Sequence, residues 1–129
     1  MSSYPTDLRY TSDHEWLRSA GTAWRVGITQ FAVNQLGDIT IVELPKVGAT
    51  VTKGESFGTI ESVKSVSELF APVSGRVTAV NAALDGSPEL INDEPYAGGW
   101  MIEIEPSHKA ELEELLSPDA YTAHVAAAE

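Results

Sequence analysis

The sequence predicts a mainly β fold in a single domain. Many short apolar runs alternate with turns, and the 10 Gly and 7 Pro residues are spread along the chain. This spacing is typical of short strands joined by tight turns. With 129 residues, 43% of them hydrophobic, the chain is long enough to bury one core, and we expect one domain over residues 1–129.

The amino-terminal part predicts two extended segments followed by one short helix. Arg9–Trp16 has extended character, and the alternation in Thr22–Ile28 predicts a strand. Thr29 is a favourable N-cap for a helix over Gln30–Leu36. Gly37 then suits the left-handed residue that ends such a helix.

The middle of the chain predicts further strands and a hairpin. Ile39–Leu44 reads as a buried strand, and Val47–Gly54 as a shorter strand with a turn. Two β-type runs then flank Lys64, which is the only cation in the stretch Gly58–Gly75. We expect this lysine at the tip of a hairpin, where its side chain projects into water.

After the hairpin, Gly75–Asn81 predicts a strand and Ala82–Asn92 an irregular loop. Tyr96–Glu105 returns to extended structure with a period of two. One predicted face carries Trp100, Ile102 and Ile104, and the other carries Met101, Glu103 and Glu105.

The carboxy-terminal part changes to helical spacing. Lys109–Leu116 predicts one helix, and Ser117 with Pro118 provides the cap and first turn of a second helix that runs through Ala128. We therefore expect a β core over about residues 8–105 and a helical segment over about residues 107–128 that packs on the sheet.

The net charge of the chain restricts the classes of molecule that it can bind. The chain has 8 lysine and arginine residues against 19 aspartate and glutamate residues, a formal charge of −11. Such a surface repels nucleic-acid phosphate and anionic lipid, whereas electropositive rims of protein partners attract it. We expect neither a nucleic-acid nor a membrane role. With no targeting peptide evident at the amino terminus, we expect a bacterial-type cytoplasmic protein.

The sequence offers no catalytic or metal-binding motif. It contains no cysteine, so any redox-active sulfur must be attached covalently from outside. His14, His108 and His124 are far apart and lack ligand spacing, which argues against a metal site. Phosphate-binding, dinucleotide and nucleophile motifs are also missing from the sequence.

Nine separated pieces of the sequence occur in a characteristic order across nearly the whole chain. They are Ser12–Trp16, Val26–Thr29, Leu36–Gly37, Val42–Pro45, Gly58–Ser65, Ala71–Gly75, Leu90–Asn92, Pro95–Tyr96 and Gly99–Met101. In order and spacing they resemble the H proteins of the glycine cleavage system, which are lipoyl carriers. One such piece could arise by chance, but the set makes the resemblance specific.

The resemblance implies the architecture and the role. The fold would be a lipoyl-domain-like flattened barrel-sandwich hybrid of two antiparallel sheets, with one lipoate amide-linked to Lys64. The chain would shuttle the aminomethyl group of glycine from a pyridoxal-phosphate-dependent glycine decarboxylase to a tetrahydrofolate-dependent aminomethyltransferase. Electrons from the reduced lipoyl group would then pass to a dihydrolipoyl dehydrogenase. Lipoylation enzymes would attach the lipoyl group to the lysine. The chain would be a carrier and not an enzyme.

The resemblance also implies a cleft that shelters the loaded arm. Its residues would be Glu15, Gln35 and Glu68, with both carboxylates stabilising a protonated amine. The chain departs from some family members here: Gln35 stands where they have a histidine, and Glu68 where an aspartate is common. For Glu15 the alternative is an ordinary solvated carboxylate at the end of a strand.

Other functions compete with the glycine shuttle. Without the surrounding motif, Lys64 would be interpreted as an ordinary turn lysine that is exposed to solvent and has no specific function. A biotin acceptor has the same fold, but its lysine usually lies between methionines, whereas Val63 and Ser65 flank Lys64. An H-like protein that relays lipoyl groups during lipoate assembly, or a non-catalytic interaction module, remains an alternative.

Overall fold

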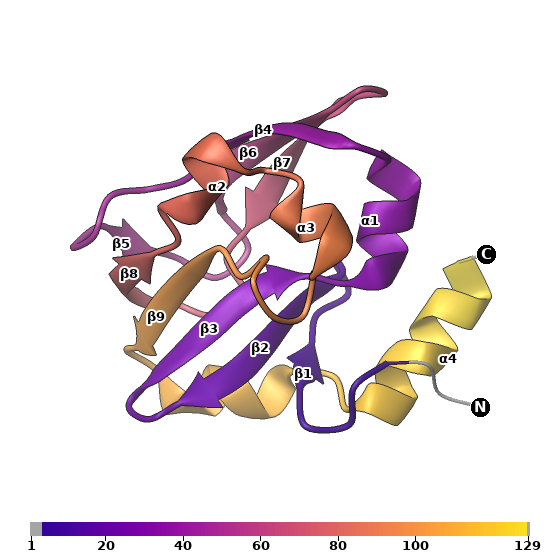
Figure 1. Cartoon of the computed structure of the whole chain (residues 1–129). Coiled ribbons are helices and arrows are strands. Elements are labelled where there is room, and N and C mark those ends of the chain that lie inside the picture. The colour runs from indigo at the N-terminus through magenta and orange to yellow at the C-terminus, as the bar shows by residue number, and fades with distance from the viewer. Residues whose placement is uncertain (1–3, 129) are drawn as a thin grey trace.

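Two antiparallel sheets form the body of the protein, as predicted. The structure is a computed structural model that describes residues 4–128. A six-stranded sheet has the strand order β1-β2-β3-β9-β8-β5, and a three-stranded sheet has the order β4-β6-β7 (Figure 1). Within residues 4–128 the two sheets stay separate and do not close into one barrel. The strands are β1 (Arg9–Tyr10), β2 (Glu15–Ala20), β3 (Ala23–Ile28), β4 (Ile39–Glu43), β5 (Thr50–Val51), β6 (Ser56–Ser62), β7 (Val66–Phe70), β8 (Gly75–Val80) and β9 (Ile102–Pro106).

The helix before β4 forms as the sequence predicts. Helix α1 spans Gln30–Leu36, and the Thr29 side chain accepts a hydrogen bond from the Ala32 amide at 3.4 Å. The chain leaves the helix at Gly37, whose φ of +79° favours glycine because a side chain is strained there. Both ends of α1 are thus set by local chemistry.

The prediction of an irregular loop over Ala82–Asn92 is wrong. The segment contains two four-residue helices, α2 (Ala83–Gly86) and α3 (Leu90–Asp93). Each buries one aliphatic side chain in the core, Leu84 and Ile91 respectively. Helices of one turn are too short to show a helical period, so tertiary burial decides them.

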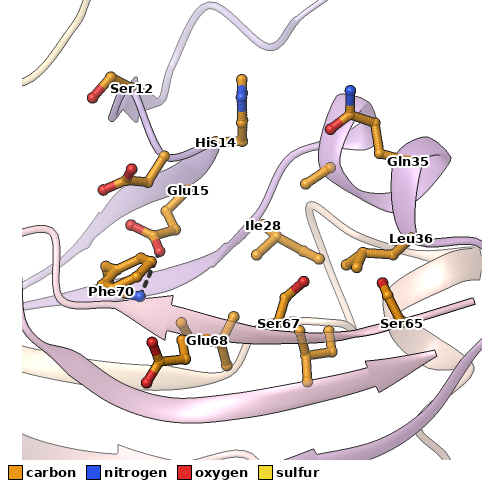
Figure 2. Close-up of a pocket in the computed structure, with 14 residues that line it drawn as sticks. Ser12, His14, Glu15, Ile28, Gln35, Leu36, Ser65, Ser67, Glu68 and Phe70 are labelled. Atoms are coloured by element: carbon orange, nitrogen blue, oxygen red, sulfur yellow. Dashed lines mark hydrogen bonds between the residues drawn. The ribbon is translucent and has the colours of Figure 1, made fainter.

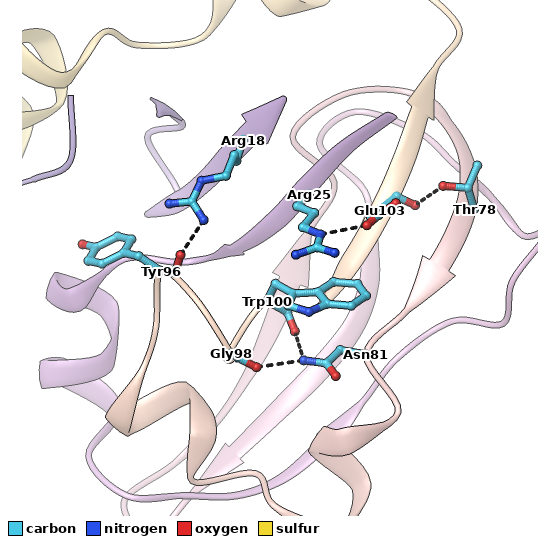
Figure 3. Close-up of polar contacts among 8 residues, drawn as sticks. All are labelled: Arg18, Arg25, Thr78, Asn81, Tyr96, Gly98, Trp100 and Glu103. Carbon is cyan, nitrogen blue, oxygen red and sulfur yellow. Dashed lines mark hydrogen bonds and ion pairs between the residues drawn. The ribbon is translucent and has the colours of Figure 1, made fainter. Parts of the chain in front are cut away.

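The strand predicted over Tyr96–Glu105 begins only at Ile102. The preceding residues form a loop because buried side chains bind their carbonyl oxygens. Asn81 Nδ2 donates to the carbonyl oxygens of Gly98 and Trp100 at 2.9 and 2.7 Å (Figure 3). In consequence Met101 is fully buried instead of facing outward, while Ile102 and Ile104 are buried as predicted.

Two other predicted segments change in detail. The extended segment Arg9–Trp16 is divided between β1 and β2 by a turn, in which His14 has a φ of +69°. The predicted helix over Lys109–Leu116 is a 3₁₀ helix over Lys109–Glu114. Helix α4 spans Pro118–Ala128, starting at the predicted proline.

The core has two parts. The larger cluster fills the space between the sheets, with Leu17, Ile60, Leu69, Val77 and Ile104 among its members. A second cluster joins α4 to the amino-terminal strands through Leu8, Tyr10, Trp16, Tyr121 and Val125. The rings of Tyr10 and Tyr121 stack with their centroids 4.6 Å apart. The carboxy-terminal helix therefore packs beside β1 (Figure 1), and Trp16 of β2 belongs to the same cluster.

The exposed face of the six-stranded sheet has its own polar layer. The Arg25 guanidinium lies 4.6 Å from the centre of the Trp100 ring, and Arg25 Nε donates to Glu103 at 2.8 Å (Figure 3). Arg18 donates to the Tyr96 carbonyl oxygen at 2.8 Å. These contacts hold the loop before β9 against β2 and β3, which belong to a different sheet from the β6–β7 hairpin.

We predict that Asn81→Ala destabilises the protein by about 2–4 kcal/mol, because it leaves two carbonyl oxygens of the loop without their donor. Urea unfolding followed by tryptophan fluorescence measures the loss. Asn34→Ala is the control, since Asn34 is exposed on α1 and bonds only the Gln30 side chain. Equal stability changes in the two variants would show that Asn81 does not hold the loop.

Candidate functional site

Lys64 lies at the tip of the β6–β7 hairpin, as predicted, and its side chain is exposed. The turn around it is held by local hydrogen bonds. The Ser62 hydroxyl accepts from the amides of Lys64 and Ser65, both at 3.2 Å, and the Ser62 amide donates to the Ser65 carbonyl at 2.8 Å. The Val63 amide donates to the Asp38 carbonyl at 3.0 Å, which ties the tip to the loop after α1. The backbone of Lys64 is therefore held in place by hydrogen bonds, whereas its side chain is exposed to solvent.

The stem of Lys64 runs over the end of helix α1. A Cβ added to Gly37 would lie 3.3 Å from Lys64 Cε and 3.6 Å from Cδ, so the stem lies directly against this glycine. A larger residue at position 37 would both strain the backbone and push the lysine away. Gly37 thus allows the backbone turn that ends α1 and also leaves room for the side chain of Lys64.

A pocket of about 580 Å³ opens beside the hairpin. We call it the hairpin pocket; it lies between β7, the turn before β2 and helix α1 (Figure 2). Its lining residues are Ser12, Asp13, His14, Glu15, Ile28, Ala32, Gln35, Leu36, Ile60, Ser65, Ser67, Glu68, Leu69 and Phe70. Since Ser65 follows Lys64 in the chain and Leu36 precedes Gly37, one end of the pocket lies next to the lysine.

The structure brings the three predicted cleft residues into this one pocket. Glu15 comes from β2, Gln35 from α1 and Glu68 from β7. Glu15 is 2% exposed, whereas Gln35 and Glu68 are exposed. The alternative interpretation of Glu15 as a solvated carboxylate is wrong, because its side chain is buried in the pocket wall.

Burial dominates the electrostatics of Glu15. Burial raises the pKa of its carboxyl from 4.5 to about 8, and the negative charge of Asp13 acts in the same direction. Two hydrogen bonds to the carboxyl oppose this shift, from the Phe70 amide at 2.9 Å and from the Thr11 hydroxyl at 3.2 Å. Because the rise prevails, the Glu15 carboxyl is mostly protonated at neutral pH.

His14 is a pocket residue that sequence reasoning missed. The structure places its ring centroid 5.5 Å from that of His124, although the two residues are 110 positions apart. The fold thus brings His14 and His124 together although they are far apart in the sequence. Burial, and then the neighbouring His124, lower the pKa of His14. Within residues 4–128 no group of three or more acidic or histidine side chains is placed to hold a metal ion.

The sequence did contain a signal for the open pocket. Ser67 and Leu69 share one face of β7 by alternation, Ser65 lies just before the strand in the same phase, and all three line the pocket. A strand face that closed a core would place large apolar residues at positions 65 and 67. Two serines there indicate a face that is left partly uncovered.

The pocket suits a flexible chain with an apolar body and a polar end. Its apolar lining comes from Ile28, Ala32, Leu36 and Ile60, and its polar groups come from Glu15 and the rim. The volume lies within the usual range for small-molecule sites, roughly 300–1,000 Å³. A lipoyl group amide-linked to the neighbouring lysine would supply an apolar chain, and its end becomes polar when it carries an aminomethyl group, so the residues present fit it.

None of the helices within residues 4–128 is long and apolar enough to cross a membrane.

Comparison with known proteins gives one consistent family. Residues 8–128 match the family model for the glycine cleavage H-protein. The glycine cleavage system H protein of Anaeromyxobacter sp. (strain K) is 60% identical over 121 residues, covering 94% of each chain. That of Mycobacterium avium (strain 104) is 55% identical over 126 residues, covering 94% of this chain and 96% of the relative. The crystal structure of a glycine cleavage system H protein from Mycobacterium marinum superposes with a TM-score of 0.88 at 43% identity, covering 95% of this chain and 99% of the other.

We predict that burial of Glu15 makes stability depend on pH. The pKa of its carboxyl is higher in the folded chain than in the unfolded chain, so between about pH 4.5 and 8 the folded chain binds more protons. The free energy of unfolding therefore falls as pH rises through this interval, by up to ~1.4 kcal/mol per pH unit. Glu15→Gln should flatten this slope in urea unfolding series. Glu68→Gln, at the exposed rim, is the control, and an unchanged slope in Glu15→Gln would contradict the prediction.

Proposed function

The chain belongs to the glycine cleavage H-protein family, and from this premise we propose that Lys64 is the residue to which its lipoyl group is attached. Members of this family carry covalent lipoate in glycine cleavage and are carrier subunits without catalytic activity of their own. The observation that carries the proposal is the position of Lys64, exposed at the tip of a rigid hairpin and next to the mouth of the hairpin pocket.

The chain's residues suit a swinging arm with a fixed base. Amide formation on Nζ removes the positive charge and extends a side chain that is already flexible. The bonds of Ser62 and the anchor from Val63 to Asp38 keep the backbone of the tip in place. When bound, the lipoyl group supplies a disulfide that accepts the aminomethyl group of glycine and two electrons, chemistry for which the cysteine-free chain has no sulfur.

We propose that the hairpin pocket shelters the loaded end of the arm. Glu15, at the wall, would offer a carboxyl that donates a hydrogen bond while neutral. A protonated amine close by would favour its carboxylate form, since an opposite charge lowers the pKa of an acid. At the rim, Glu68 adds a carboxylate and the Gln35 amide can either donate or accept. The site can therefore present a negative charge to a bound cation, although it buries no permanent anion.

The chain works with the other components of the glycine cleavage system. We propose that these partners are the pyridoxal-phosphate-dependent decarboxylase, the tetrahydrofolate-dependent aminomethyltransferase and dihydrolipoyl dehydrogenase, together with lipoylation enzymes. Two features support repeated short contacts: the charge of −11, and the exposed Val63 and Val66 on either side of Lys64. We further propose that residues 1–129 act as one domain in the cytoplasm.

We predict that Lys64→Arg abolishes lipoylation and, with it, glycine–bicarbonate exchange in the presence of the partner enzymes. The arginine keeps the charge and the fold but cannot form the amide. Intact mass and peptide mapping of protein from its native host measure the modification, and the exchange assay measures the shuttle.

Lys46→Arg is the matched control, since Lys46 is an exposed loop lysine that does not line the hairpin pocket. A lipoyl increment that persists in Lys64→Arg would refute the assignment. A lipoylated protein without exchange activity would favour a relay role in lipoate assembly.

We predict that Glu15→Gln speeds the release of ammonia from the loaded protein by roughly tenfold, because the amide cannot become an anion beside the amine. Ammonia is measured over time after removal of the partner enzymes. The exposed Glu113→Gln, which does not line the pocket, is the control. A release rate equal to that of the unchanged protein would show that Glu15 has no sheltering role.

A further inference from the structure

The hydroxyl of Tyr121 does not line the hairpin pocket, but it contacts His14, which lines the pocket, and Thr29, the N-cap of the helix whose later residues line it. Tyr121 belongs to α4 and is fully buried. Its oxygen lies 2.6 Å from Thr29 Oγ1 and 2.8 Å from His14 Nδ1. These are hydrogen-bond distances, so one phenol joins helix α4, the start of α1 and the turn before β2.

The first wall depends on the backbone of His14. His14 is the only non-glycine residue with a positive φ in the described part of the chain. A residue in this conformation is strained unless its surroundings hold it there. The His14 amide donates to Thr11 at 3.1 Å, its carbonyl accepts from the Thr29 amide at 2.9 Å, and its ring meets Tyr121. Glu15 follows His14 directly, so the position of its carboxyl depends on how His14 is held.

The second wall is helix α1. Thr29 is its N-cap and is fully buried, and its hydroxyl accepts from the Ala32 amide. The helix carries Gln35 and Leu36 into the pocket and ends at Gly37, against the Lys64 stem. The first turn of α1 is therefore held by the Thr29 hydroxyl, which is itself bonded to Tyr121.

We propose that Tyr121 is a positioning residue for the hairpin pocket, holding the turn before β2 and helix α1 at the separation that the loaded arm requires. The inference rests on the proposed sheltering role of the pocket. It assigns the carboxy-terminal helix a part in carrier function, through Thr29 and His14.

The test compares Tyr121→Phe with Tyr10→Phe in the full lipoylated chain. Tyr121→Phe removes the hydroxyl and keeps the ring that stacks on Tyr10. Tyr10→Phe removes a hydroxyl from the same aromatic cluster, but that hydroxyl donates to the Pro5 carbonyl at 2.6 Å and does not touch the hairpin pocket. The two variants thus match in chemistry and burial and differ in their link to the pocket.

Ammonia release from the loaded protein is the first readout, measured below the melting temperature of every variant. Tyr121→Phe should accelerate release roughly threefold to tenfold, the change in an equilibrium that corresponds to one buried hydrogen bond. Tyr10→Phe should leave the rate unchanged. Equal acceleration by both variants would overturn the proposal, because it would reflect general loosening of the cluster.

Glu15→Gln separates failure of this proposal from failure of the proposed function. If Glu15→Gln accelerates release and Tyr121→Phe does not, the pocket shelters the arm and Tyr121 does not position it. If neither variant changes the rate, the sheltering role fails and the positioning role falls with it.

A second readout does not depend on the arm. In the unlipoylated chain, ¹⁵N NMR should show a shifted His14 Nδ1 resonance in Tyr121→Phe and an unchanged one in Tyr10→Phe, and the reverse result would overturn the proposal. Thr29→Ala removes the hydroxyl that bonds the Tyr121 hydroxyl. It replaces Tyr121→Phe as the test variant if Tyr121→Phe does not fold. It should accelerate ammonia release as well, and an unchanged rate would contradict the proposed coupling.

Discussion

The inner face of the β6–β7 hairpin is the constraint on which the site depends. Ile60 and Leu69 are buried in the core between the sheets, and their burial sets the register of the two strands. A slip of one residue would turn every side chain of a strand to the other face. The register places Lys64 at the tip and directs Ser65 and Ser67 toward the hairpin pocket. The lysine and the pocket beside it are thus consequences of one packing arrangement.

Around that hairpin the protein combines a rigid backbone with a lysine side chain that is exposed to solvent. The backbone of the tip is bonded to itself and to the loop after α1, while the lysine head stays in solvent. The pocket wall holds Glu15 largely uncharged when it is not facing a cation. Burying an ionisable group opposes folding because its charged form loses water. Under the proposed sheltering role, this placement makes a negative charge available only when a cationic group arrives.

The carboxy-terminal helix is more than a cover for β1 and β2. Its aromatic cluster with Tyr10 and Trp16 fixes α4 on the large sheet, and Tyr121 reaches from that cluster to Thr29 and His14. The small sheet carries the lysine, the large sheet carries Glu15, and α1 lies between them. A helix at the end of the chain therefore bonds the two elements whose separation defines the pocket.

Local patterns in the sequence determined the approximate positions of most strands, the caps of α1 at Thr29 and Gly37, and the exposed position of Lys64, because alternation, capping and turn chemistry act over a few residues. Resemblance to a family indicated Glu15, Gln35 and Glu68 as one group. Tertiary structure alone decided the one-turn helices α2 and α3, the burial of Met101, the raised pKa of Glu15 and the meeting of His14 with Tyr121. Each of these depends on side chains far apart in the sequence, and burial and long-range hydrogen bonds have no local pattern to reveal them.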